Sequence, residues 1–129
     1  MNHSPAQKQK ALEDILKGVV ADGYYEAALL SDGDGLLLAV AAPDETAAMM
    51  AAMTATLRST AMRVHKQLEL APVDELSLVC DDRFHLVCRF LNTDVGAPLI
   101  LTVVVPPNHS YRRITNQAIT NIQAVLADE

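Results

Sequence analysis

Cys80, His85 and Cys88 are the residues whose types and spacing come closest to a metal site or a nucleophile–base pair. On a strand, His85 and Cys88 would point to opposite faces because side chains alternate, and a closed zinc site needs four ligands. A tight hairpin centred near Asp82 would offset the two cysteines by several positions, too far for a disulfide. The pattern therefore favours two small, buried hydrophobic residues in a reducing compartment.

The segment Asp32-Gly33-Asp34-Gly35 is the other candidate for chemistry. It lacks the further carboxylates and the distal glutamate of an EF-hand loop, so a tight turn is favoured over a calcium site. The sequence has no phosphate-binding glycine loop and no GxSxG elbow, and Asp81-Asp82 is typical of a hairpin turn. We therefore expect a protein that is not an enzyme, with no catalytic residue, no metal site and no cofactor.

The amino-acid composition and the N-terminal sequence argue against further classes of protein. Half of the 129 residues are hydrophobic and the net charge is −6, with no basic stripe, which argues against a nucleic-acid partner. The polar N-terminus does not resemble a signal peptide, and the longest apolar run, Leu99–Val105, is too short to cross a bilayer. We expect one domain spanning residues 1–129, located in the cytoplasm without direct membrane insertion.

Capping residues, turns and hydrophobic periodicity divide the chain into eight elements. Ser4-Pro5-Ala6-Gln7 is a helix start with a capping box, and Gly23 is expected to end that helix. The order is α-β-β-α-β-β-β-α, with helices over 4–23, 44–70 and 110–126 and strands over 27–31, 36–42, 75–80, 84–91 and 98–105. The last strand is apolar on both faces and should be central. This predicts an α/β fold, a three-layer α/β/α sandwich around one antiparallel sheet of five strands.

The second helix is apolar or small on two sides. One stripe is expected to cover the sheet: Met49, Met53, Leu57, Thr60, Val64 and Leu68. The opposite face carries Ala48, Ala51, Ala55, Ser59 and Met62. A helix that is apolar on two sides is buried on two sides, so this face predicts contact with another subunit; an exposed alanine-rich helix is the alternative.

The strand after this helix supports the same interface. It contains Leu76, Leu78 and Cys80 and has neither proline nor lysine to protect it at a sheet edge. Pairing with a second copy would cover it. Helix packing and strand pairing together predict a two-fold homodimer interface.

The order and three segments resemble the roadblock family, named for a dynein light chain and its bacterial relatives. The segments are the apolar hairpin Ala27–Ala39 with its aspartate-glycine turn, the alanine-rich helix after Pro43-Asp44-Glu45, and the β-β-β-α ending. The resemblance implies a five-stranded antiparallel sheet with the second helix on one face and the terminal helices on the other. It also implies dimerisation through the second helix and third strand.

Family members act as scaffolds or regulators, often of Ras-like small GTPases, and bacterial single-domain members resemble partners of gliding-motility GTPases. The resemblance therefore implies a homodimeric adaptor or regulator of such a GTPase, with Arg58 and Arg63 as candidate partner-binding residues beside Ser59 and Met62.

The connection Pro106–Arg113 is longer than the resemblance implies. Arg112 and Arg113 at the start of a helix are unfavourable with its dipole, so they either meet an acidic partner or are simply solvated. Two other functions stay open, a small-ligand sensor and a general scaffold unrelated to GTPases, as does a heterodimer with a related chain.

Overall fold

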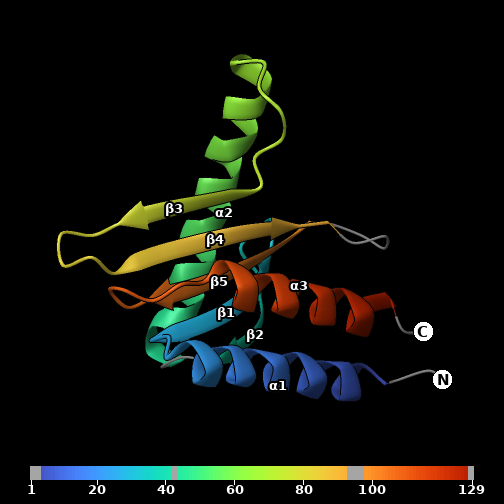
Figure 1. Ribbon diagram of the computed structural model, residues 1–129. Helices are drawn as coiled ribbons and strands as arrows, with labels where there is room; N and C mark the ends of the chain where they lie inside the picture. Colours follow the sequence, from blue (N-terminus) through green and yellow to red (C-terminus); the bar gives the residue numbers. More distant parts are fainter. Residues whose placement is uncertain (1–3, 42–43, 93–97, 128–129) are drawn as a thin grey trace.

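The computed structural model describes residues 4–41, 44–92 and 98–127 (Figure 1). The predicted order of elements is confirmed, with boundaries shifted by up to three residues. The helices are α1 (Pro5–Gly23), α2 (Asp44–Gln67) and α3 (Arg112–Ala127), and the strands are β1 (Ala27–Asp32), β2 (Leu37–Ala41), β3 (Glu75–Val79), β4 (His85–Leu91) and β5 (Leu99–Val105). Ala42, expected in the second strand, lies outside the described residues.

The five strands form one antiparallel sheet in the order β2-β1-β5-β4-β3. Helices α1 and α3 cover one face and α2 crosses the other (Figure 1). The predicted three-layer α/β/α sandwich is thus confirmed. Within the described residues, no helix is both long enough and apolar enough to span a membrane.

The central position of β5 explains its continuous apolar sequence. Leu101 and Val103 belong to the core shared with α1 and α3, whereas the alternate residues Ile100 and Thr102 face α2. All four are fully buried. A strand covered on both faces is apolar at nearly every position, which is why the sequence of β5 does not alternate between apolar and polar residues.

Both ends of α1 are set by local contacts. Ser4 Oγ accepts from the Gln7 amide and Gln7 Oε1 from the Ser4 amide, so the predicted capping box is confirmed. The C-terminal cap differs from expectation, because Tyr24 rather than Gly23 adopts the left-handed conformation, with φ 56°. Gly23 serves another purpose: a Cβ there would lie 2.3 Å from the Tyr25 ring, which packs across the helix end.

The β1–β2 turn is held by its own aspartate and approached closely by α2. Asp32 Oδ1 accepts from the backbone amides of Asp34 and Leu36, both at 2.9 Å. Gly35 has a φ of +92°, and a Cβ there would lie 3.2 Å from the Cα of Ala52 on α2. Glycine is therefore required at this position both by conformation and by space.

Gly35→Ala should lower the free energy of unfolding by about 1–2 kcal/mol, since the side chain would be strained and crowded. Gly18→Ala is the matched control. Gly18 lies within α1 with open space around it, so alanine there should stabilise the protein by about 0.5–1 kcal/mol. Urea unfolding followed by circular dichroism measures both. Shifts of the same sign would contradict this account of the turn.

Candidate interaction surface

The face of α2 that lies against the sheet is built from small residues. Ala47, Ala51, Thr54 and Ala61 are buried, at the i, i+4 and i+3 spacing of one helical stripe. Thr54 Oγ1 donates to the Ala51 carbonyl at 2.8 Å. Small side chains let the helix approach the sheet closely.

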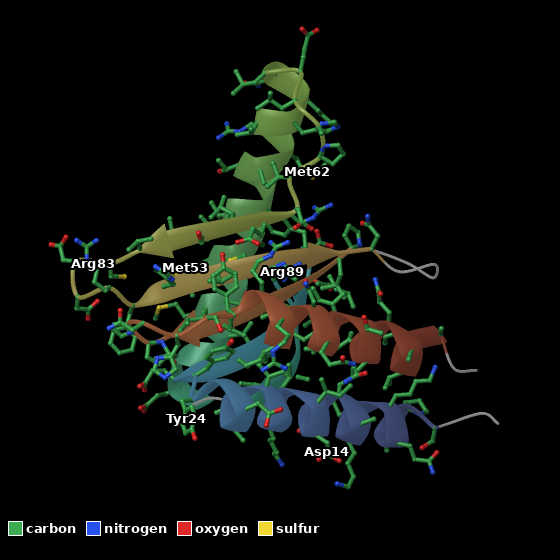
Figure 2. All side chains as sticks on the ribbon, viewed as in Figure 1. Asp14, Tyr24, Met53, Met62, Arg83 and Arg89 are labelled. Carbon is green, nitrogen blue, oxygen red and sulfur yellow. The ribbon has the colours of Figure 1, made fainter. Side chains whose placement is uncertain are left out.

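The expected sheet-covering stripe is therefore wrong. Its residues Met49, Met53 and Leu68 are 63%, 56% and 64% exposed, while Leu57, Thr60 and Val64 are only partly buried. The error has a physical cause. A helical wheel ranks the faces of a helix by hydrophobicity, whereas the face that becomes buried is the one whose side chains fit the space left above the sheet. The large side chains consequently form an exposed apolar flank on α2 (Met53 is labelled in Figure 2).

The opposite flank of α2 holds the residues expected to face another subunit. Ala48 and Ser59 are exposed, Met62 is 37% exposed and Ala55 is partly buried. Ala51 is the exception: it is fully buried within its own chain, its carbonyl close to the Gly35 turn, so its assignment to a subunit interface is wrong.

Strand β3 lies at the edge of the sheet, where its sequence is unprotected against pairing. Leu78 and Val79 are 47% and 56% exposed, and Leu76 is partly buried. The C-terminal turns of α2 extend past this strand (Figure 1). A free strand edge and an exposed apolar helix thus lie on the same side of the molecule.

The two cysteines have different environments. Both are free thiols, as expected, but Cys80 is exposed just beyond β3, so the prediction that both are buried is wrong for Cys80. Cys88 is fully buried, and burial raises the pKa of its thiol to about 11. Among the described residues, no three His, Cys, Asp or Glu are grouped as metal ligands would be.

At about pH 8 a thiol reagent should therefore modify no more than about one cysteine per native chain, because Cys88 stays both covered and protonated. Denatured protein should react at both positions. Mass spectrometry of digested protein locates the label, and Cys80→Ser should abolish the native reaction. Rapid labelling of Cys88 in the native protein would contradict this prediction, because it would show that the sheet opens around Cys88.

The four candidate partner-binding arginines do not form one patch. Arg63 is exposed on α2 and Arg58 is partly buried on the same helix. Arg112 and Arg113 lie at the start of α3, on the other face of the sheet. Arg112 Nη1 pairs with Glu75 and lies 3.5 Å from Asp74 Oδ2, so its acidic partner is within the chain. These carboxylates offset the unfavourable dipole contact.

Arg89 is a buried cation that the sequence analysis missed. Its side chain runs from β4 to α3 (Figure 2), donating to Thr115 Oγ1 at 2.6 Å and Asn116 Oδ1 at 2.8 Å. The carboxylates of Asp74 and Glu75 each lie 3.8 Å from its guanidinium. An arginine within an otherwise apolar strand was the available signal, because a charge there requires buried partners.

The same carboxylates tie β3 to the start of α3. Besides its pair with Arg112, Glu75 accepts a hydrogen bond from the Tyr111 hydroxyl. This bond, helped by burial, raises the pKa of the Tyr111 hydroxyl above its ordinary value. The edge strand is therefore held from the helical layer as well as by β4.

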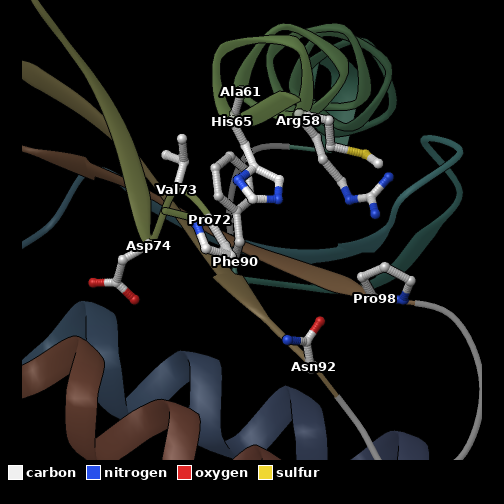
Figure 3. Close-up of a pocket in the computed structure, with 10 residues that line it drawn as sticks. Arg58, Ala61, His65, Pro72, Val73, Asp74, Phe90, Asn92 and Pro98 are labelled. Carbon is white, nitrogen blue, oxygen red and sulfur yellow. The ribbon is translucent and has the colours of Figure 1, made fainter. Parts of the chain in front are cut away.

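A hollow of about 360 Å³ lies between the C-terminal half of α2 and one end of the sheet (Figure 3). Ala61, Val73 and Phe90 are among its apolar lining residues, and Arg58 lies at one side. Figure 3 shows the rings of His65 and Phe90 near its centre. His65 Nδ1 is hydrogen-bonded to the Leu70 carbonyl, which connects the helix to the segment returning from it.

Known proteins share both the sequence pattern and the fold of this chain. The sequence profile of the Roadblock/LC7 domain matches residues 11–103. The chain belongs to the Roadblock/LC7 family. The matched range runs from α1 to β5, so it contains both α2 and the β3 edge. No curated protein sequence matches this Roadblock/LC7 chain.

Solved structures share the fold. MglB of Myxococcus xanthus superposes with a TM-score of 0.79 at 15% identity, covering 92% of this chain and 89% of that chain. The gliding protein MglB of Thermus thermophilus gives 0.76 at 16% identity, covering 97% and 93%. An MglB in a tetrameric arrangement gives 0.72 at 17%, covering 97% and 92%. At these identities the likeness establishes the Roadblock/LC7 fold.

Proposed function

We propose that this Roadblock/LC7 chain is a homodimeric adaptor or regulator of a Ras-like small GTPase. The observation that carries the proposal is the position of the exposed α2 flanks beside the free edge of β3. Exposed apolar residues on neighbouring elements are typical of protein–protein interfaces.

Two-fold pairing of β3 with a second copy would use both features. It would satisfy the unpaired backbone groups of the edge strand and cover Leu76 and Leu78. Because α2 extends past β3, each α2 would then reach over the partner's sheet (Figure 1). The remaining predicted interface residues are Ala48, Ala55, Ser59, Met62 and Cys80. The similar MglB structures include a tetrameric arrangement, which supports self-association in chains of this fold.

The GTPase part of the proposal draws on the family and on the similar gliding protein MglB. In such a dimer the paired α2 helices would present Arg63 and the exposed methionines Met49 and Met53 to the GTPase. Arg112 is engaged with Glu75 and is a weaker candidate than Arg63.

The test is capture of a GTPase from source-cell lysate by the immobilised protein, once with a non-hydrolysable GTP analogue and once with GDP. We expect one small GTPase to be retained in one nucleotide state and identified by mass spectrometry. An Arg63→Glu variant should retain less of it. Equal recovery in both states, or no GTPase in either, would contradict a nucleotide-dependent role and favour a general scaffold.

A further inference from the structure

The hollow beside α2 combines an apolar floor with an arginine, Arg58, that has no ion-pair partner among the described residues. Its apolar lining comes from four separate segments, with Ala61 on α2, Val73 on the returning segment, Phe90 near the end of β4 and Pro98 just before β5. Its volume of about 360 Å³ is at the lower end of the range of known ligand pockets. It can therefore hold an apolar group larger than a methyl group, but not a large cofactor.

Arg58 supplies the cation. Among the described residues it makes no hydrogen bond or ion pair, although it is partly buried. Its guanidinium packs on the β1–β2 turn, where a Cβ on Gly33 would lie 3.1 Å from Nη1. The turn backbone thus limits where the guanidinium can go, which lowers the entropy lost when it binds a ligand.

The acidic residue of the lining does not neutralise Arg58. Asp74 lies at the other side of the hollow (Figure 3), and its carboxylate is 3.8 Å from Arg89 Nη2 and 3.5 Å from Arg112 Nη1. Within the part of the chain that the structure describes, Arg58 therefore forms no ion pair, although Asp32 and Asp34 flank the Gly33 backbone on which it packs. A partly buried cation attracts a carboxylate more strongly than a fully solvated one does.

We propose that this hollow binds a short acidic segment of another protein, which inserts one apolar side chain over Phe90 and places a neighbouring carboxylate on Arg58. A protein segment is favoured over a free small molecule because the hollow includes Met62, which is 37% exposed on the flank of α2 opposite Met53. A partner seated on α2 could therefore extend directly into it. The site requires no GTPase, so it does not depend on the GTPase part of the proposed function, but it shares Met62 with the proposed dimer interface.

The test uses a random dodecapeptide library displayed on phage, selected against the full chain and against Arg58→Glu. Lys66→Glu is the matched control, because Lys66 is an exposed cation on the same helix and does not line the hollow. The wild type and the control should enrich peptides in which aspartate or glutamate adjoins an apolar residue. The selected peptide, labelled with a fluorophore, should bind Arg58→Glu at least about tenfold more weakly, as expected for loss of a charge pair.

Amide chemical shifts of the wild type should change at Ala61, Val73 and Phe90 when the peptide is added. Circular dichroism of Arg58→Glu confirms that the variant is folded. No enrichment, or equal binding to Arg58→Glu, would overturn the proposal. A small acid that copurifies with the wild type but not with Arg58→Glu in native mass spectrometry, and that blocks the peptide, would overturn the peptide assignment in favour of a small-ligand site.

Discussion

Replacing Arg89 with methionine should lower the free energy of unfolding by about 3 kcal/mol. Arg89 is 4% exposed and donates to Thr115 and Asn116. Its removal would leave those acceptors without their donor and would leave the Glu75 carboxylate paired with Arg112 alone. Methionine is long enough to fill most of the space, so the loss should come from the polar contacts. Urea unfolding followed by circular dichroism gives the value.

Arg63→Met and Arg112→Gln are the controls for this prediction. Arg63 is exposed and makes no contact with the network, so its variant should unfold at the wild-type midpoint. Arg112 pairs with Glu75 but is 55% exposed, and solvent weakens such pairs, so its variant should lose less stability than Arg89→Met. An Arg89→Met protein as stable as the wild type would show that the buried network is energetically neutral.

Leu78→Glu should convert the proposed dimer to a monomer. The substitution places two like charges against each other where the β3 edges meet, and it removes an apolar side chain that is 47% exposed in the single chain. We expect the dissociation constant to rise at least about 30-fold, the effect of removing an interface hot spot. Light scattering after size-exclusion chromatography should change from about twice 13.9 kDa to 13.9 kDa.

Leu36→Glu is the matched control, because Leu36 is 63% exposed beside β2, at the opposite edge of the sheet. It should leave the mass unchanged. A wild-type protein that is already monomeric at micromolar concentration, or a Leu78→Glu variant that still dimerises, would contradict the β3 interface. Ala55→Glu is a less specific alternative, since the Ala55 Cβ lies 3.5 Å from where a Cβ on Gly35 would be.

Glu75 connects the two predictions. It lies in β3, the edge strand through which the proposed dimer would pair. It also lies close to the guanidinium groups of Arg89 and Arg112. The network on the α3 face therefore restrains the strand that the dimer would use. If both predictions hold, Arg89→Met should also weaken dimerisation.

Local sequence signals predicted the elements and their layering. The capping box at Ser4, the Asp32 turn and the apolar run of β5 each depend on contacts within a few residues or on burial of both strand faces. Such signals can be recognised in the sequence because they depend on residues that are close together along the chain. The free edge of β3 was also anticipated, since its sequence lacks the residues that protect an edge.

Three features were decided only when distant segments came together. The small stripe of α2, rather than its methionines, packs on the sheet because the sheet side chains leave little space there. Arg89 is tolerated in β4 because residues 26 and 27 positions later in α3 supply its acceptors. The hollow at Arg58 is assembled from α2, the returning segment, the end of β4 and Pro98 before β5. Periodicity along one element identifies which faces are apolar, but which face is covered depends on the shape and charge of the neighbours against which it packs.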